Sequence, residues 1–285
     1  MTAVSQAPRA LPMTPGRRVA LAIGVPVALA VIAATGLSLV ADIGQASFPV
    51  SLPSIPVRHG QLAVGTGGGD LTVHQGQGGT ARLVGTVEYT FVRPTVYNRP
   101  TADGTSIAVK CRTAVGNCGL DATLAVPAGV GVALSSGGGN MSVSGIDNSV
   151  ALASGGGDVT ISGVAGTAEV DTGGGNVTAA GLAATLHFTT DGGDVNGTGL
   201  AAASVTVASG GGNVTMRFTR APRNVVVASG GGDVTVVVPR GVTAYHIVSA
   251  AAGGGYAVSV PTSSSSPHLI SVDSGGGNIT ITEAG

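Results

Sequence analysis

The decapeptide SGGGDVTISG, from Ser154 to Gly163, contains three consecutive glycines, an acidic residue and a short apolar–polar alternation. Glycine loses more backbone freedom on folding than any other residue, so three in a row need a physical reason. They are candidates for cradling a ligand, binding a metal or turning the chain. Related segments elsewhere in the chain distinguish these roles.

Similar segments recur at a nearly constant interval. From Asn140 onward, the residue after the glycines returns after 18, 18, 18, 19, 20, 23 and 22 residues. A fixed period in this range is typical of stacked supersecondary units. With an earlier copy included, the aligned residues are Asp70, Asn140, Asp158, Asn176, Asp194, Asn213, Asp233, Tyr256 and Asn278.

Apolar and polar residues alternate on both sides of the glycines, which is the period of a β-strand. Val150 and Leu152 precede one glycine run, and Val159 and Ile161 follow it. A second glycine followed by an aliphatic residue, as in 163–164, marks another corner. Each unit is therefore predicted to be strand, glycine corner, strand and second corner.

Equivalent strands of such units would stack in parallel, about 4.8 Å apart, around a narrow aliphatic core. We predict an all-β fold, a right-handed parallel β-solenoid (single-stranded β-helix) with about 18–22 residues per coil. An array of antiparallel hairpins is the alternative. The copy AAGGGYAVSV at 251–260 is expected to slip by one residue, which would turn Val258 and Val260 inward.

The residue after the glycines would form a column in a parallel stack. A column of aspartates would repel at every rung, whereas Asn and Asp alternate here, which separates like charges by about 9.6 Å. We therefore predict a structural ladder rather than a cofactor or metal site, formed by Asp70, Asn140, Asp158, Asn176, Asp194, Asn213, Asp233 and Asn278.

Two ligand-binding interpretations of the glycine corners compete with the ladder. Gly/Asp-rich nonapeptide repeats bind Ca²⁺, but this chain has one Gly-Gly-Gly-Asp/Asn per coil, and half of the acids are amides. Asp171, Asp191 and Asp194 remain the residues that would hold a stray cation. A phosphate cradle is not favoured, because no Lys-Ser/Thr follows the glycines and no helix is predicted to begin there.

The N-terminal region predicts a membrane anchor. Residues 19–41 form 23 positions without a charge, long enough for a helix to cross a bilayer. Arg9, Arg17 and Arg18 precede this segment, so we expect 1–18 in the cytoplasm and the rest outside, as a single-pass cell-membrane protein. A cleaved signal peptide is the alternative. Proline-containing residues 42–60 are expected to form an extended spacer before a solenoid domain at 61–285.

The repeat is interrupted at 80–126, which we expect to be an irregular insert that caps the N-terminal end of the stack. Within it, Cys111 and Cys118 would lie outside the membrane, where disulfides persist, and are predicted to form one local bridge. The end of the stack after the last repeat is expected to be poorly capped or covered by a partner.

Charged residues are scarce, at 9% of the 285 residues, and Lys110 is the only lysine. This composition, with a net charge of −1, argues against nucleic acid as a partner. The five histidines show no metal-ligand spacing. Four arginines at second corners are candidate contacts for an anionic envelope polymer, with a solvated loop as the alternative: Arg217, Arg220, Arg223 and Arg240.

The runs SGGGDVTISG, TGGGNVTAAG and SGGGDVTVVVPRG, after an N-terminal apolar segment and a cysteine-pair insert leading to LDATLAVPAG, resemble bacterial envelope proteins of the β-strand-repeat, putative-adhesin family. The resemblance covers most of 62–282. It implies a right-handed β-helix, and it supplies no catalytic residues.

Two classes of function are consistent with the sequence. The first is a non-enzymatic, membrane-anchored surface module that binds the cell wall, a polymer or another protein. The second is a carbohydrate-active β-helix enzyme, which should show Asp/Glu clusters with Arg or Lys on adjacent rungs. Because the recurrent acids lie at corners and only three glutamates are present, we favour the first class. An accessory role in envelope-stress signalling is a further alternative.

Overall fold

The computed structural model describes residues 45–57, 60–112, 117–183, 185–241 and 244–285. The chain divides into two units, Met1–Gln45 and Ala46–Gly285, and the fold given below is that of the second. The predicted tail and membrane span at 1–41 lie outside the described residues. Within those residues, no helix has the length and apolarity needed to cross a bilayer.

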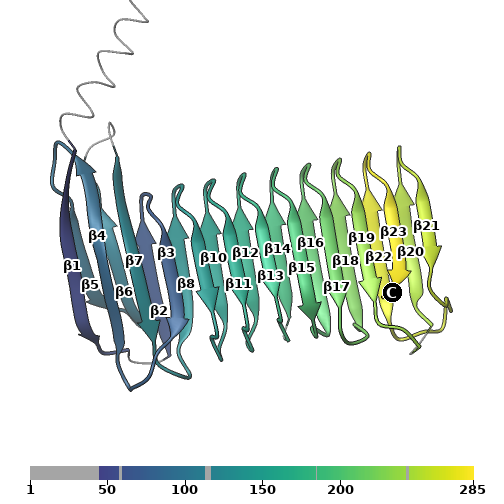
Figure 1. The fold of residues 1–285 in the computed structure, drawn as a ribbon, viewed down its shortest axis with the longest axis horizontal. Helices are drawn as coiled ribbons and strands as arrows, with labels where there is room; N and C mark the ends of the chain where they lie inside the picture. Colours follow the sequence, from purple (N-terminus) through teal and green to yellow (C-terminus); the bar gives the residue numbers. More distant parts are fainter. Residues whose placement is uncertain (1–44, 58–59, 113–116, 184, 242–243) are drawn as a thin grey trace, which may run out of the picture. The chain divides into compact units, whose positions relative to one another are not determined.

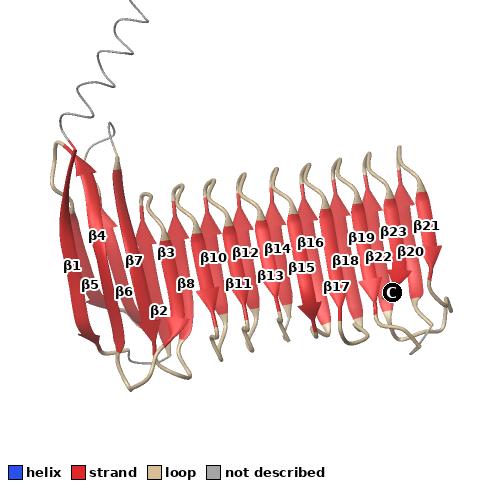
Figure 2. Ribbon diagram, in the orientation of Figure 1, coloured by secondary structure: helices blue, strands red, loops and turns tan. Residues whose placement is uncertain are grey.

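The described chain is all-β, with two sheets and no helix among the described residues (Figures 1 and 2). In spatial order, the 12-stranded sheet A contains β1 (Gln45–Ile55), β4 (Ala81–Thr90), β7 (Cys118–Val126), β3 (Leu71–Gln75), β9 (Met141–Ser144), β11 (Val159–Ser162), β13 (Val177–Ala180), β15 (Val195–Leu200), β17 (Val214–Phe218), β19 (Val234–Val238), β23 (Ile279–Glu283) and β21 (Tyr256–Ser259).

The 11-stranded sheet B follows the same path. Its spatial order is β5 (Thr95–Pro100), β6 (Gly104–Lys110), β2 (Gln61–Thr66), β8 (Gly131–Ser136), β10 (Val150–Ser154), β12 (Ala168–Thr172), β14 (Leu186–Thr190), β16 (Ser204–Ser209), β18 (Asn224–Ser229), β22 (Leu269–Ser274) and β20 (His246–Ala251).

Repeating strands pair in parallel with equivalent residues in register. Val150 of β10 aligns with Val132 of β8 and with Ala168 of β12, and the other sheet repeats this pattern. One strand from each sheet makes a coil, and the apolar residues of both strands are buried between the sheets. The structure is therefore a parallel β-solenoid rather than a hairpin array, as predicted; the handedness stays a prediction.

The second corner is also as predicted in the early coils. Gly145, Gly163, Gly181 and Gly199 have φ between 60° and 65°, the left-handed region that glycine tolerates best. The aliphatic residue after each of these glycines is buried, and these residues are Ile146, Val164, Leu182 and Leu200. The corner therefore turns the chain and returns it to the core.

The chain order of the coils is inverted at the C-terminal end. The coil β22–β23 lies between β18–β19 and β20–β21, so the expectation that the last repeat ends the stack is wrong. The inserted coil offers four aliphatic residues to the core, Ile270, Val272, Ile279 and Ile281, all fully buried. The coil outside it places Ser249 and Tyr256 in two of the same rows, so the more apolar coil occupies the inner position.

The segment 80–126 caps the N-terminal end as predicted, but it is not irregular. Strands β6 and β7 continue the parallel stack beyond β2 and β3, and β5 and β4 then pair with them in antiparallel fashion. The coil β2–β3 therefore lies between two coils that come later in the chain, β6–β7 and β8–β9.

The extended spacer predicted at 42–60 is also corrected by the structure. Strand β1 occupies most of this segment and pairs with β4 at the edge of sheet A. Pro49 and Pro53 lack a backbone N–H, and an edge strand tolerates them because one side of it needs no donor. The side chains of Val50 and Ile55 join the core.

Candidate functional site

The residue after each glycine run forms a continuous hydrogen-bonded column at the first corner. Each backbone N–H in the column donates to the Oδ1 atom of the residue one coil away, at 2.7–2.9 Å. In spatial order the members are Asp121, Asp70, Asn140, Asp158, Asn176, Asp194, Asn213, Asp233, Asn278 and Gly255.

This column contains all eight predicted ladder residues and two more. Asp121 adds a rung that sequence alignment missed, because no glycine run precedes it. Gly255, rather than Tyr256, occupies the terminal rung, which matches the one-residue slip predicted for this copy. Val258 accordingly aligns with the buried Ile281, and Val260, just beyond the end of β21, is partly buried and also packs against the core.

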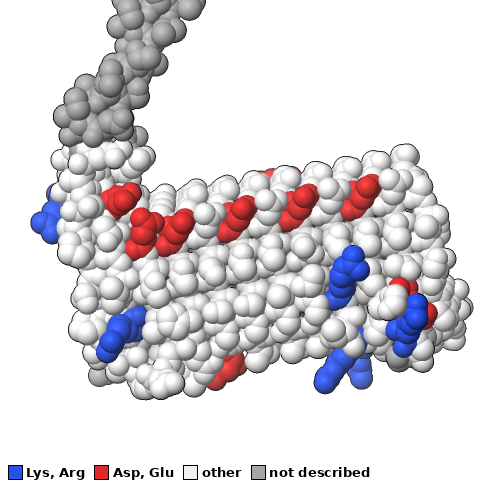
Figure 3. Space-filling view, in the orientation of Figure 1, with Lys and Arg blue, Asp and Glu red and all other residues white. Residues whose placement is uncertain are grey.

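Both Asn and Asp can accept the backbone N–H, so this hydrogen bond does not depend on the alternation of the two residues. The alternation acts on the charges and on the side-chain donors of the column. Two amide side chains also donate to the neighbouring carboxylate, from Asn176 to Asp158 at 3.2 Å and from Asn278 to Asp233 at 3.0 Å. Acidic side chains consequently form a spaced row on this side of the stack (Figure 3). The Oδ1 atoms of these side chains are already engaged by backbone donors.

A second column at the same corner was missed by the sequence reasoning. In seven coils a buried Ser or Thr precedes the glycines, and its hydroxyl accepts the N–H three residues later, at 2.9–3.2 Å. The regular Ser/Thr at this position in the repeats was the available signal. Its members are Ser136, Ser154, Thr172, Thr190, Ser209, Ser229 and Ser274.

The glycines allow two backbones to approach closely at this corner. A Cβ on Gly157 would overlap the carbonyl oxygen of Gly139, whereas a Cβ on Gly156 would meet open space. In the described part of the chain, no three His, Cys, Asp or Glu side chains are grouped to hold a metal ion. The first corner is therefore built by backbone and side-chain hydrogen bonds, and Asp171 and Asp191 lie outside the ladder.

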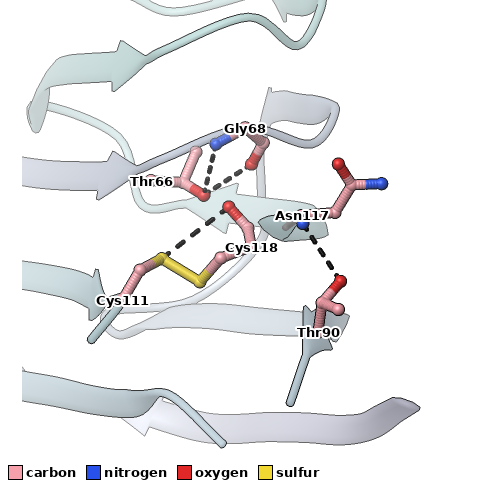
Figure 4. Close-up of a disulfide and its surroundings, with 6 residues drawn as sticks. All are labelled: Thr66, Gly68, Thr90, Cys111, Asn117 and Cys118. Carbon is pink, nitrogen blue, oxygen red and sulfur yellow. Dashed lines mark hydrogen bonds between the residues drawn. A yellow bond between two sulfur atoms is a disulfide. The ribbon is translucent and has the colours of Figure 1, made fainter. Parts of the chain in front are cut away.

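The cap coil turns its first corner differently. Cys111 follows β6, Cys118 begins β7, and the two form a disulfide with a Cα–Cα distance of 6.1 Å (Figure 4). Nearby, the N–H of Asn117 donates to Oγ1 of Thr90 at 3.0 Å, which ties the corner to β4. The predicted bridge is present, and it lies at the first corner of the coil β6–β7, which has no glycine run.

A groove of ligand size lies on the outer face of sheet B. Its floor consists of Ala, Ser and Gly residues from four neighbouring strands, aligned in two rows by the parallel register. We call it the small-residue groove, with the floor Ser106, Ala108, Ala63, Gly65, Ala133, Ser135, Ala151 and Ala153.

Larger side chains bound the groove at both ends. Tyr97 and Arg99 of β5 align with Ala108 and Ser106, and at the other end Glu169 and Asp171 of β12 align with Ala151 and Ala153. Two adjoining hollows of about 520 and 440 Å³ share part of this floor. The five strand spacings from β5 to β12 give a length of about 24 Å.

The charges of the groove are separated along its length. Arg99 and Lys110 lie at the β5–β6 end, and the guanidinium of Arg99 stacks 4.7 Å from the ring centre of Tyr97. Glu169 and Asp171 lie at the other end and are exposed. The groove can therefore bind an anionic group at one end and a cationic or hydroxyl group at the other. Sequence alignment showed Ala and Ser in these slots, but not the larger walls that make them a floor.

The four arginines predicted to contact a polymer lie elsewhere. Arg217 is on β17 of sheet A, whereas Arg220, Arg223 and Arg240 follow β17 and β19 at the second corner, and all four are exposed. None of them lines the small-residue groove. Their role in polymer binding stays a prediction.

The fold and its first corner define a class of protein: a two-sheet parallel β-solenoid whose coils turn on glycine runs and an Asn/Asp column. Residues 120–282 match the family model described as Toastrack DUF4097, and the chain belongs to this family. No curated protein matches the chain.

Solved structures with a similar fold share little sequence with this chain. A putative adhesin from Bacteroides fragilis NCTC 9343 is 16% identical, with a TM-score of 0.54, and the match covers 84% of this chain and 97% of that one. Others are a putative adhesin from Parabacteroides merdae ATCC 43184 (13%, TM-score 0.42, coverage 85% and 96%) and a putative lipid binding protein from Parabacteroides distasonis ATCC 8503 (11%, 0.39, 85% and 97%). Because so little sequence is shared, the first of these matches establishes the fold alone.

Proposed function

We propose that this protein is a non-enzymatic, membrane-anchored surface module that binds an extended polar polymer of the cell envelope in the small-residue groove. The groove carries the proposal, because a floor of small side chains lets a chain-like ligand lie close to the sheet. The name of its structural neighbour from Bacteroides fragilis, a putative adhesin, agrees with a binding role.

The groove matches a polymer with both anionic and cationic or hydroxyl groups. Arg99 and Lys110 would pair with carboxylates, and Glu169 and Asp171 would accept hydrogen bonds from amines or hydroxyls. A length of about 24 Å accommodates about seven residues of an extended peptide, or a comparable length of glycan. Peptidoglycan combines these groups and is the first probe to use.

The binding test compares two substitutions in one row of sheet B. Ala153→Tyr fills the groove floor, whereas Ala208→Tyr, three coils away in the same row, leaves the groove unchanged. We expect saturable retention of the protein on insoluble peptidoglycan, weakened about tenfold by Ala153→Tyr, which equals about 1.4 kcal/mol, and unaffected by Ala208→Tyr. Absence of retention, or equal loss in both variants, would contradict the proposal.

Two alternatives give different results in the same preparation. A carbohydrate-active enzyme would release soluble fragments from a polysaccharide panel, whereas we expect no turnover. If the protein were an envelope-stress accessory, deletion of its gene would change the transcription of stress genes, and the protein would not be retained on peptidoglycan.

The membrane anchor rests on the uncharged segment at 19–41. We expect the protein to remain with membranes after alkaline carbonate extraction, and deletion of 19–41 to release it. Extraction of the intact chain by carbonate would contradict anchoring and would leave the groove test unaffected.

A further inference from the structure

The last coil of the stack has an edge in each sheet that no other described strand covers; the nearest pairing is the bridge from Tyr245, just before β20, to Thr262. Strands β20 and β21 are terminal in sheets B and A, and within the described chain each pairs with a single neighbour, β22 and β23 respectively (Figure 1). The free backbone N–H and C=O groups of an edge strand are a template for another strand.

The apolar core also opens to solvent at this end. Tyr256 occupies the same inward row as Ile279, yet Tyr256 is 54% exposed while Ile279 is fully buried. Ile247 on β20 and Val258 on β21, which align with the buried Ile270 and Ile281, are only half-buried. A strand added here would cover these side chains and extend the core.

The edges at the opposite end of the stack are protected. Edge strand β1 contains Pro49 and Pro53, and edge strand β5 contains Arg99 and Pro100. Prolines and charges are the usual means by which proteins prevent edge pairing. In contrast, β20 (HIVSAA) and β21 (YAVS) contain no proline and no Lys, Arg, Asp or Glu.

The terminal coil is not equipped to receive another solenoid coil in parallel. The Gly255 N–H donates the last ladder bond to Oδ1 of Asn278, but Gly255 has no side-chain oxygen that could accept from a further rung. Ala251 aligns with Ser274, so the hydroxyl that holds the glycine corner in other coils is also missing. Parallel, head-to-tail growth would therefore lose both hydrogen-bonded columns and would meet the proline-containing edges of the next molecule.

We propose that β20 and β21 dock against the same strands of a second copy of this chain, forming a two-fold dimer. A two-fold axis reverses strand direction, so the edges pair in antiparallel fashion without needing the ladder, and the assembly closes at two copies. Because neither strand carries a charged Asp, Glu, Lys or Arg side chain, two identical edges meet without like-charge repulsion. The edges are short, so the dimer is weak and forms at high local concentration.

Sedimentation equilibrium of the full chain in mild detergent, up to about 100 µM, tests this proposal. Tyr256→Lys puts a charge in the inward row of the edge, where dimerisation would bury it. Thr235→Lys adds the same charge on the outer face of β19. We expect a reversible dimer for the native chain and for Thr235→Lys, and at least about a tenfold higher dissociation constant for Tyr256→Lys, or about 1.4 kcal/mol.

Three outcomes would overturn the proposal: a native chain that stays monomeric, a dimer that Tyr256→Lys leaves unchanged, or assembly beyond two copies. A dimer formed through the N-terminal segment would give the second of these. Circular dichroism of both lysine variants establishes that they are folded, and Tyr256→Phe, which keeps the apolar ring, should dimerise like the native chain.

Discussion

At the first corner, the regular coils turn with the same glycines, the same buried hydroxyl and the same column of Oδ1 acceptors. At the second corner, the connections change from five residues at 145–149 to three at 201–203 and nine at 260–268. The first corner brings backbones too close together for a side chain, whereas the second corner lies where the chain can lengthen into solvent. The repeats are therefore alike at the first corner and vary in length at the second corner.

The largest expected effect separates two adjacent glycines of the first corner. Gly157→Ala forces a Cβ against the backbone of Gly139 and should lower the free energy of unfolding by about 3 kcal/mol. Gly156→Ala meets open space and should change it by less than about 0.5 kcal/mol. Urea denaturation of both variants measures the difference, and equal effects would show that close approach does not set the glycine requirement.

The second effect concerns the disulfide that replaces the glycine run in the cap coil. Replacing Cys111 and Cys118 with Ser should cost about 2.5 kcal/mol, because the short loop is no longer closed in the unfolded chain. Hydrogen exchange should increase in β6 and β7 and stay slow in β14 and β16. Uniform loss of protection in all four strands would instead indicate that the cap and the stack unfold as one unit.

A smaller effect tests the alternation in the ladder. Asn213→Asp keeps the Oδ1 acceptor for Asp233 but places three carboxylates on consecutive rungs. At about 4.8 Å spacing, each new pair costs about 1 kcal/mol in water, and salt should relieve most of it. Asn213→Ala removes the acceptor, so its loss of stability should persist at 1 M salt, where the Debye length is about 3 Å. Salt-insensitive loss in the Asp variant would argue against charge spacing.

The smallest effect is expected at the second corner, near the bridge from Tyr245 to Thr262. The Tyr245 hydroxyl is buried and has no hydrogen-bond partner among the described residues, so Tyr245→Phe should stabilise the protein by about 1 kcal/mol.

The same residue has a defined pH dependence. Burial, and secondarily the Glu283 carboxylate, raises the pKa of Tyr245. The unfolded chain therefore loses the phenol proton first, and stability falls as the pH rises above about 10. Thermal unfolding from pH 8 to 11 should show a smaller alkaline decrease for Tyr245→Phe; an identical decrease would assign it to other groups.

The coil itself was predictable because it is local: alternating residues such as Val159 and Ile161 identify the inward rows, and the recurring glycine run identifies the first corner. The neighbours of each coil were not predictable in the same way. Repeat alignment predicts that Asn278 is equivalent to Asp233. It does not predict that the coil of Asn278 lies between the coil of Asp233 and the coil of Gly255. The prolines of β1 likewise predicted a spacer, because an edge position is a property of the assembled sheet.

The groove was only partly visible for the same reason. Ala133, Ser135, Ala151 and Ala153 are small in the sequence, but a floor exists only beside the walls that β5 and β12 supply. Tyr97 and Ala108, which align across β5 and β6, are brought to the groove by the antiparallel cap. The wall on β5 therefore depends on the part of the fold that the repeat does not encode.

The inverted order of the final coils has a consequence for biosynthesis. Coils up to β18–β19 can pair with the growing stack as each leaves the ribosome. Strands β20 and β21 cannot pair with the stack until β22 and β23, which lie between them and β18–β19, have been synthesised. Asp233 gains its partner from Asn278, 45 residues later. Translation must therefore reach β23 before this end of the core can close. Chains truncated before β23 would expose unpaired strands to proteases.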